Sequence, residues 1–365
     1  MIIMAKRITG ISRDLIIHPG ETIADILVER DITQAELAAR TGVTPAYVCN
    51  VIAGKKDISA KFAFALEYAL GVSKSFWINL QANYDAELLE INAAETITEE
   101  ERTARDSLKE VVKYLRESGR MPIKEGVDDS ILSLRKALQI SNIANLKELL
   151  PAGALRMSAK SKTDPYVMGA WIRLCQIAGE HRNVKTRFDA KKVDELVEKS
   201  KVVMCTAGES VQKALTELFS EYGIDFSVVR NFRGAPVQGF ISQKNDGTYQ
   251  MVLTIRGAYA DIFWFSLFHE LGHIVNGDVN GTANYIDYDE HAETEIGAND
   301  FASTRLINPE EYAAFVEKGD YSLDAIKTFA RSQSVRPYIV IGRLQREKKL
   351  DYNRYSSEKV RYKWA

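Results

Sequence analysis

Residues 260–276 read ADIFWFSLFHELGHIVN and decide the fold of the C-terminal part of the chain. The apolar side chains of this stretch recur with the spacing of a helix, at Phe263, Trp264, Leu267, Ile274 and Val275. Asn276 and Gly277 then supply a helix stop. His269 and His273 are four positions apart, so on a helix both imidazoles project from one face. The stretch therefore predicts a buried helix that presents two histidines at one point.

This pair of histidines has the spacing of a zinc site. Two imidazoles one turn apart can hold a single Zn²⁺, and Glu270 between them can reach the metal-bound water as its base. Three of the five histidines in the chain, including His291, lie within 23 positions of one another, which argues against a chance match. We predict that His269 and His273 bind Zn²⁺ and that Glu270 is catalytic.

A catalytic zinc takes three protein ligands and keeps one position open for water. Glu295 begins a helical pattern and shares its face with Ala298 and Ala302, so we predict that Glu295 points inward and is the third ligand. One turn further on, Asn299 is predicted to hydrogen-bond His269 and fix its ring. The side chains just before this helix are interpreted as a solvated acidic loop; they are Glu290, His291 and Glu293.

The sequence before the histidine helix changes to the alternating pattern of strands at residues 224–229, 237–241 and 249–255. Asn245-Asp246-Gly247 predicts that the last two strands form a hairpin. The strand at 249–255 is a candidate edge for a substrate peptide, although core packing explains its Val and Ile equally well. Helical patterns return at 294–306, 309–318, 322–332 and 337–348.

These motifs resemble the ImmA/IrrE family of zinc metallopeptidases. The resemblance rests on residues 263–268 (FWFSLF) before the histidine motif and on Glu295-x-x-Ala298-Asn299-x-Phe301-Ala302 after it, and it covers roughly residue 207 to the C-terminus. It implies a zincin-like metallopeptidase domain in which Glu295 is the third ligand. Gly297 departs from the Glu or Gln that is common in the family. Residues 335–345 resemble the version of this domain that is fused behind an Xre helix-turn-helix.

Peptide hydrolysis at such a site requires a base and an oxyanion donor. Glu270 would take a proton from water and pass it to the leaving amine. Three side chains are candidate oxyanion donors by their proximity in sequence alone: Arg256, Tyr285 and Tyr288.

Residues 19–83 carry five short helical patterns, of which residues 34–53 fit a helix-turn-helix. Thr33 is a predicted cap of the second helix, and Thr44 followed by Pro45 begins the third. Val48 and Val51 can pack inward, which leaves the other face of the third helix for DNA. The candidate base contacts are Thr44, Ala46, Tyr47 and Asn50, and the candidate phosphate contacts are Lys55 and Lys56.

Charge does not decide between DNA binding and other uses of this helical region. The whole chain has 48 basic and 50 acidic side chains, a net charge of −2, which excludes a globally basic nucleic-acid binder. Residues 1–90 hold 9 basic and 11 acidic side chains. A protein-docking bundle therefore remains an alternative interpretation.

The same region resembles the HigA-type antitoxins of the Xre helix-turn-helix class. The matching segments are Pro19-Gly20-Glu21, residues 33–38 (TQAELA) and residues 73–85 (SKSFWINLQANYD). The resemblance implies a homodimer that binds a palindromic operator and often represses its own toxin–antitoxin operon. From the residues alone, Phe76, Trp77 and Leu80 indicate only an apolar face, either core or dimer contact.

The length and composition of the chain limit its domain organisation. The 365 residues are 45% hydrophobic and 27% charged, typical of globular domains. We predict an α+β, mostly helical protein: a five-helix DNA-binding domain at 1–93, a helical connecting region at 94–206, and a zincin-like domain with a small β-sheet at 207–365. Its three cysteines fit no disulfide framework and are interpreted as buried side chains in a reducing cytoplasm: Cys49, Cys175 and Cys205. No export signal or membrane span is expected.

The sequence thus predicts a cytoplasmic DNA-binding regulator fused to a zinc-dependent endopeptidase that cleaves a regulatory protein, such as a repressor or an antitoxin. The alternative is a HigA-like repressor whose zinc domain senses or binds a partner, such as a toxin, without turnover. A weaker interpretation makes the middle helices a toxin-neutralising module.

Overall fold

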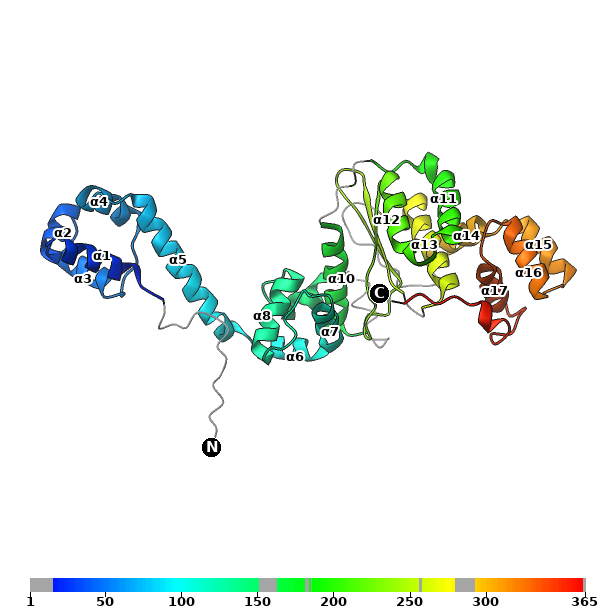
Figure 1. Cartoon of the computed structure of the whole chain (residues 1–365), viewed down its shortest axis with the longest axis horizontal. Coiled ribbons are helices and arrows are strands. Elements are labelled where there is room, and N and C mark those ends of the chain that lie inside the picture. The colour runs from blue at the N-terminus through cyan, green and yellow to red at the C-terminus, as the bar shows by residue number, and fades with distance from the viewer. Residues whose placement is uncertain are drawn as a thin grey trace, which may run out of the picture. The chain divides into compact units, whose positions relative to one another are not determined.

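The computed structural model describes residues 16–150, 163–180, 184, 186–255, 258–279 and 293–363. The chain divides into two compact units, Met1–Thr98 and Glu99–Ala365 (Figure 1). Helices dominate both units, and the described residues contain one three-stranded sheet, in the second unit. This confirms the predicted α+β, mostly helical class.

From residue 16 on, the N-terminal unit contains the five predicted helices and a short 3₁₀ helix. Their bounds are α1 Pro19–Glu29, α2 Gln34–Thr41, α3 Pro45–Ile52, α4 Ala60–Leu70, α5 Lys74–Asn92 and η2 Ala93–Thr96. Side chains from all five helices share a core with no solvent exposure: Ile23, Leu37, Val48, Val51, Leu66 and Trp77. Trp77 is therefore core, whereas its neighbour Phe76 is 45% exposed.

The turn between α2 and α3 is built as the sequence predicts. The Thr33 hydroxyl accepts the N–H of Glu36 at 3.1 Å, and the Thr44 hydroxyl accepts the N–H of Tyr47 at 3.2 Å. Between the helices Gly42 adopts a left-handed conformation with φ 71°, which favours glycine. The two caps fix where α2 and α3 begin.

Gln81, the last residue of the Phe-Trp-x-Asn-Leu-Gln segment in α5, has a structural role. Its side chain is 6% exposed. The amide oxygen accepts the N–H of Ile58 at 2.9 Å, and the amide nitrogen donates to the Asp85 carboxylate at 2.8 Å. Gln81 thus ties α5 to the segment that leads into α4.

The second unit begins with the helical middle region. Its elements are α6 Glu99–Ser107, α7 Lys109–Glu117, α8 Val127–Leu138, η3 Ile143–Leu149, α10 Pro165–Glu180, η4 Ala190–Lys192, α11 Val193–Thr206, η5 Gly208–Ser210 and α12 Val211–Glu221. The helix predicted at 143–150 is a 3₁₀ helix. It ends directly before Leu150-Pro151, because proline disfavours a helical conformation in the preceding residue.

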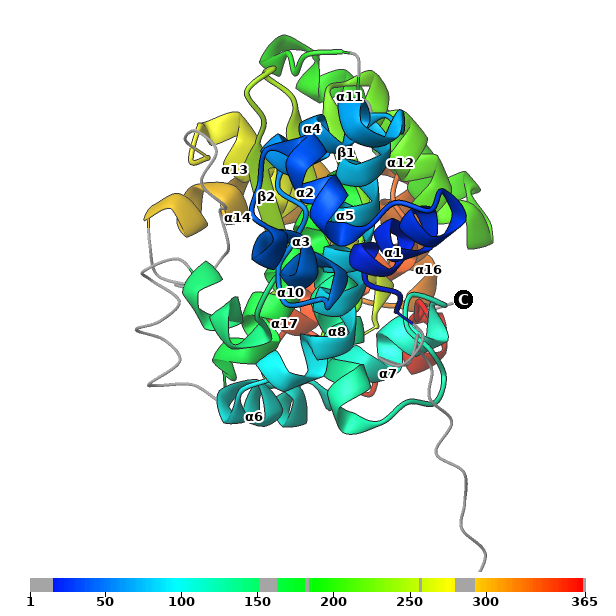
Figure 2. The same cartoon turned by 90° about the vertical axis from the view of Figure 1, so that its left-hand side faces the viewer.

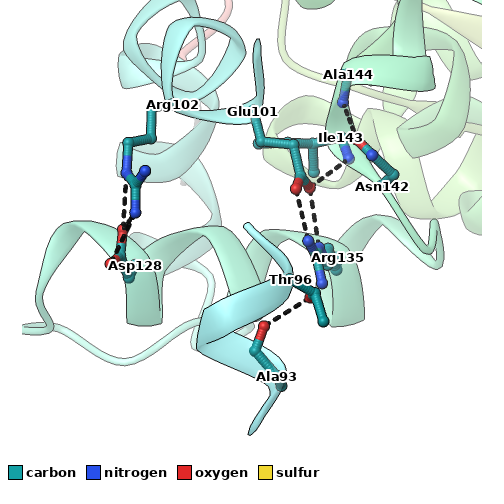
Figure 3. Close-up of polar contacts among 9 residues, drawn as sticks. All are labelled: Ala93, Thr96, Glu101, Arg102, Asp128, Arg135, Asn142, Ile143 and Ala144. Atoms are coloured by element: carbon teal, nitrogen blue, oxygen red, sulfur yellow. Dashed lines mark hydrogen bonds and ion pairs between the residues drawn. The ribbon is translucent and has the colours of Figure 1, made fainter. Parts of the chain in front are cut away.

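A buried ion pair joins three elements of this region (Figure 3). Glu101 of α6 has no solvent exposure and accepts hydrogen bonds from both Nε and Nη2 of Arg135 in α8. It also accepts the backbone N–H of Ile143 at 3.1 Å. The glutamate-rich run after residue 94 is therefore helical from Glu99 on and packs through one of its own carboxylates.

The sheet has the order β1-β3-β2, with β1 Ile224–Val228 parallel to β3 Tyr249–Leu253 and β2 Gly239–Gln243 antiparallel to it. The predicted hairpin between β2 and β3 is confirmed. The interpretation of 249–255 as an edge is wrong, because β3 lies between the other two strands. Every residue of β3 is buried, as in a central strand, so its Val and Leu reflect core packing and β2 is an edge strand.

In the described residues after the sheet lie five α-helices: α13 Ala260–Asn276, α14 Glu293–Leu306, α15 Pro309–Lys318, α16 Leu323–Ser332 and α17 Pro337–Arg346, with η6 Ser356–Glu358 near the end. α13 is the most buried of them, with Trp264, Leu267, Phe268 and Leu271 fully enclosed. In Figure 2 α13 lies beside α14 and the strands. Near the C-terminus Arg361 forms an antiparallel bridge with Tyr259, directly before α13.

The predicted burial of the cysteines is confirmed only for Cys175. Cys49 is exposed, because it lies on the outer face of α3 beside the inward-pointing Val48, and Cys205 is half-buried. Among the described helices, none has both the length and the apolar character that a bilayer crossing requires.

Candidate metal centre

The two histidines of α13 meet as predicted. The Nε2 atoms of His269 and His273 lie 3.1 Å apart, and the rings stand nearly perpendicular, at 86°. His269 is 7% exposed and His273 is fully buried. One helix face therefore presents both ring nitrogens to the same point.

Glu295 reaches that point from α14. Its Oε2 lies 3.1 Å from Nε2 of His269, and its Oε1 lies 3.3 Å from Nε2 of His273. Close packing of the two helices makes this possible, because Gly272 has no side chain and a Cβ there would lie 3.1 Å from Cα of Ala298. The structure thus brings the three predicted ligands together.

These three residues fit a zinc ion. One ligand atom from each lies within 4.8 Å of the others. Zinc binds nitrogen and oxygen at about 2.0–2.2 Å, so two tetrahedral ligand atoms stand about 3.4 Å apart. The distance of 3.1 Å between the two Nε2 atoms is close to that spacing, and each Nε2 has one oxygen of the Glu295 carboxylate at 3.1 Å or 3.3 Å. Two imidazoles and one carboxylate are also a donor set of catalytic zinc sites.

Asp278 completes the site and was missed in the sequence. Its Oδ2 lies 2.8 Å from Nδ1 of His273. A carboxylate accepts hydrogen bonds, so Nδ1 donates and the Nε2 lone pair is directed at the metal position. The one available signal was a carboxylate just after the helix stop at Gly277.

The site attracts positive charge. Burial alone lowers the pKa of His273, but the hydrogen bond to Glu295, the charge of Glu270 and the hydrogen bond to Asp278 outweigh burial and raise the pKa to about 9. The carboxylates that stabilise a proton on the His273 ring would stabilise a divalent cation at the same place.

Glu270 is 1% exposed and packs against β2. Gly239 at the start of β2 leaves the room for it, since a Cβ on Gly239 would lie 1.8 Å from Oε1 of Glu270. The predicted base is therefore held between the metal helix and the edge strand.

Substitution of Gly239 by alanine is expected to destabilise the second unit by about 1–3 kcal/mol, because the new methyl group overlaps the Glu270 carboxylate. Urea unfolding of the full chain measures the effect. In a Glu270→Ala background the same substitution is expected to cost less than about 0.5 kcal/mol, because the overlapping atoms are gone. Equal costs in the two backgrounds would contradict this packing.

A pocket of about 1030 Å³ opens beside the centre and is lined by His269 and Glu295. Asn299, one turn after Glu295, also lines the pocket. Its hydrogen bond to His269 stays a prediction. Gln238, next to Gly239, also lines the pocket and accepts the Ser266 hydroxyl at 2.8 Å. Space for a peptide therefore lies next to the proposed ligands.

Several predicted residues lie outside the described part of the chain. They are the oxyanion candidates Arg256, Tyr285 and Tyr288 and the loop residues Glu290 and His291. Glu293 begins α14, but its side chain is likewise outside the description.

The proposed DNA contacts lie on the outer face of the helix-turn-helix. Thr44, Ala46, Asn50, Lys55 and Lys56 are exposed, and Tyr47 is half-buried. The Tyr47 ring packs against Phe62 with centroids 5.0 Å apart, and Nζ of Lys56 lies 4.3 Å from its centroid. Val48 and Val51 are buried, as predicted.

Two regions of the chain match known protein families. Residues 23–77 match the helix-turn-helix family, and residues 259–336 match the family described as the IrrE N-terminal-like domain, a peptidase family. The second match contains α13, α14 and all three proposed ligands.

Individual relatives match about a fifth of the chain. Virulence-associated protein A' of Dichelobacter nodosus is 42% identical over 69 residues, which are 19% of this chain and 60% of that protein, so the chain spans about 60% of this relative's length. Two solved structures are similar with a TM-score of 0.21 each. They are an addiction module antidote protein of the HigA family from Coxiella burnetii (28% identical, 23% of this chain, 96% of that chain) and the Pseudomonas aeruginosa antitoxin HigA with the higBA promoter (34%, 22% and 89%).

On these matches, the chain combines an Xre-type helix-turn-helix domain at residues 23–77 with an ImmA/IrrE-like domain of the IrrE N-terminal-like peptidase family at residues 259–336.

Proposed function

We propose that this protein is a cytoplasmic transcriptional regulator fused to a zinc-dependent endopeptidase that cleaves a regulatory protein, a repressor or an antitoxin. One observation carries the proposal: His269, His273 and Glu295 converge with donor spacings that suit zinc, beside a pocket of about 1030 Å³. The family match over residues 259–336 supports the peptidase half.

The residues around the pocket suit peptide hydrolysis. A bound Zn²⁺ would polarise the scissile carbonyl and acidify a water molecule. Glu270, fixed between α13 and Gly239, accepts the proton of the attacking water and returns it to the leaving amine. The edge strand β2 begins at Gly239, so a substrate that pairs with this strand runs past the Glu270 carboxylate in an extended conformation.

The zinc-loaded full chain tests the proposal when it is incubated with the proteins encoded by the neighbouring genes and the products are identified by mass spectrometry. We expect defined fragments from a repressor or antitoxin. The Glu270→Gln variant is the matched inactive control, and no cleavage by the zinc-loaded wild type would overturn the proposal.

The N-terminal unit supports the DNA half of the proposal. Its third helix presents Asn50 outward, while Val48 and Val51 hold the helix in the core. Lys55 is exposed just after the end of this helix. The similarity to an antitoxin solved with its promoter favours an operator as the target. We propose binding as a homodimer to a palindromic site, because a two-fold symmetric protein matches two half-sites.

Asn50→Ala is expected to reduce operator affinity by about 1–3 kcal/mol and to leave non-specific binding unchanged, because its amide reads a base edge. Lys55→Ala and Lys56→Ala are expected to weaken binding to every sequence and to lower the salt slope by about one, because each lysine neutralises a phosphate.

Fluorescence anisotropy with operator and scrambled duplexes at several salt concentrations separates these effects. Lys113→Ala is the control, since it removes an exposed lysine from α7 in the other unit. Unchanged operator affinity in the Asn50, Lys55 and Lys56 variants would contradict the proposed DNA-binding surface.

A further inference from the structure

Two cations line the pocket without an ion pair in the part of the chain that the structure describes. They are Arg346, at the end of α17, and Lys359, near the C-terminus. Aromatic rings position both. Cζ of Arg346 lies 4.9 Å from the ring centroid of Phe265, and Nζ of Lys359 lies 5.3 Å and 5.7 Å from those of Tyr259 and Tyr352. Cation–π contacts fix a side chain but leave its positive charge available to a ligand.

Arg346 is close to the metal centre. The Phe265 ring, against which the guanidinium packs, also stacks on the His269 ring, with centroids 6.2 Å apart and an interplanar angle of 29°. One aromatic ring therefore separates Arg346 from a proposed ligand. An extended peptide advances about 3.3 Å per residue. A side chain within a few residues of a bond at the metal can reach the guanidinium.

Most of the other charged residues that line the pocket have partners. Arg343 donates from Nε to Glu347 at 3.1 Å, and Glu295 is a proposed metal ligand. Burial raises the pKa of Asp261, while the nearby positive charge of Lys359 lowers it. Asp300, the remaining acid of the lining, is exposed on α14. Among the described residues, the lining cations without an ion pair are thus Arg346 and Lys359, and Lys359 also acts on Asp261 through its charge.

We propose that Arg346 and Lys359 form a subsite that binds a carboxylate of the peptide substrate, an acidic side chain or a free C-terminus, within a few residues of the scissile bond. This deepens the proposed function, since it names the substrate class of the same site. A fixed guanidinium suits the planar carboxylate in particular, and the ammonium of Lys359 adds a second charge.

Binding of labelled nonapeptides tests the subsite without cleavage. The peptides are random except for one central position fixed as Glu, Gln or Lys, and each set is made with free and with amidated C-termini. The receptor is the zinc-loaded full chain with Glu270→Gln, and the readout is fluorescence anisotropy. We expect the Glu set to bind about three- to tenfold more tightly than the Gln set, or the free acids more tightly than the amides, according to the source of the carboxylate.

Arg346→Gln is expected to remove this preference, and Arg346→Glu to shift it toward the Lys set. Lys359→Gln should reduce the preference for the carboxylate-bearing peptides. Lys349→Ala is the control: it removes an exposed lysine that does not line the pocket, and the peptide preference should stay unchanged. Equal binding of all peptide sets, or a preference that survives Arg346→Glu, would overturn the subsite. Cleavage by the wild type without an acidic preference would overturn only the subsite. A preference in binding without any cleavage would overturn only the peptidase proposal.

Discussion

Replacing His273 by alanine is expected to abolish stoichiometric zinc binding. The structural metal sites of small domains bind with roughly 10–16 kcal/mol, so each of four ligands contributes about 3 kcal/mol, a hundred- to thousandfold in Kd. His273 has no solvent exposure, and its ring is fixed by Asp278 at 2.8 Å, so alanine removes one of three preorganised ligands from the buried site. Metal analysis after dialysis against buffer without zinc measures the loss.

Two further variants make this result specific. Asp278→Asn keeps all three ligands but weakens the orientation of the ring, and it is expected to lower zinc affinity by about 10- to 100-fold. Asn276→Ala, at the exposed end of the same helix, should bind zinc like the wild type. Circular dichroism against the metal-free wild type separates ligand loss from unfolding. Full zinc occupancy in His273→Ala would refute the proposed ligand set.

The helices and the three ligands could be predicted because local rules determine them. Helical spacing places His269 and His273 on one face, and a small-residue face brings Glu295 inward one turn before Ala298. The caps at Thr33 and Thr44 likewise depend only on neighbouring residues. In such segments tertiary packing agrees with the local pattern.

Contacts between distant segments could not be predicted in this way. An alternating pattern identifies β3 but not its neighbours, so its central position came only from the pairing with β1 and β2. The fit of Gly239 against Glu270 joins residues 31 positions apart, and neither residue signals the other. The pocket similarly depends on Arg346 and Lys359, which follow the metal motif by more than seventy residues.

Replacing Glu270 by glutamine is expected to leave zinc bound and to reduce peptide cleavage by about 10²–10⁴-fold, the usual contribution of a general base. Glutamine has nearly the same shape, so its packing against Gly239 is retained, but the neutral amide cannot accept a proton from water. Glu270 is not among the three converging ligands, so metal content should not change. Single-turnover cleavage with metal analysis of the same sample measures both properties.

The same variant separates the two interpretations of the whole protein. If the protein regulates by proteolysis, Glu270→Gln abolishes the response of the target operon while operator binding, carried by the other unit, remains unchanged. His273→Ala should give the same regulatory defect, together with zinc loss, because base and ligand serve one reaction. A normal response in Glu270→Gln cells combined with a lost response in His273→Ala cells would instead show that the zinc domain senses or binds a partner without turnover, as in a HigA-like repressor.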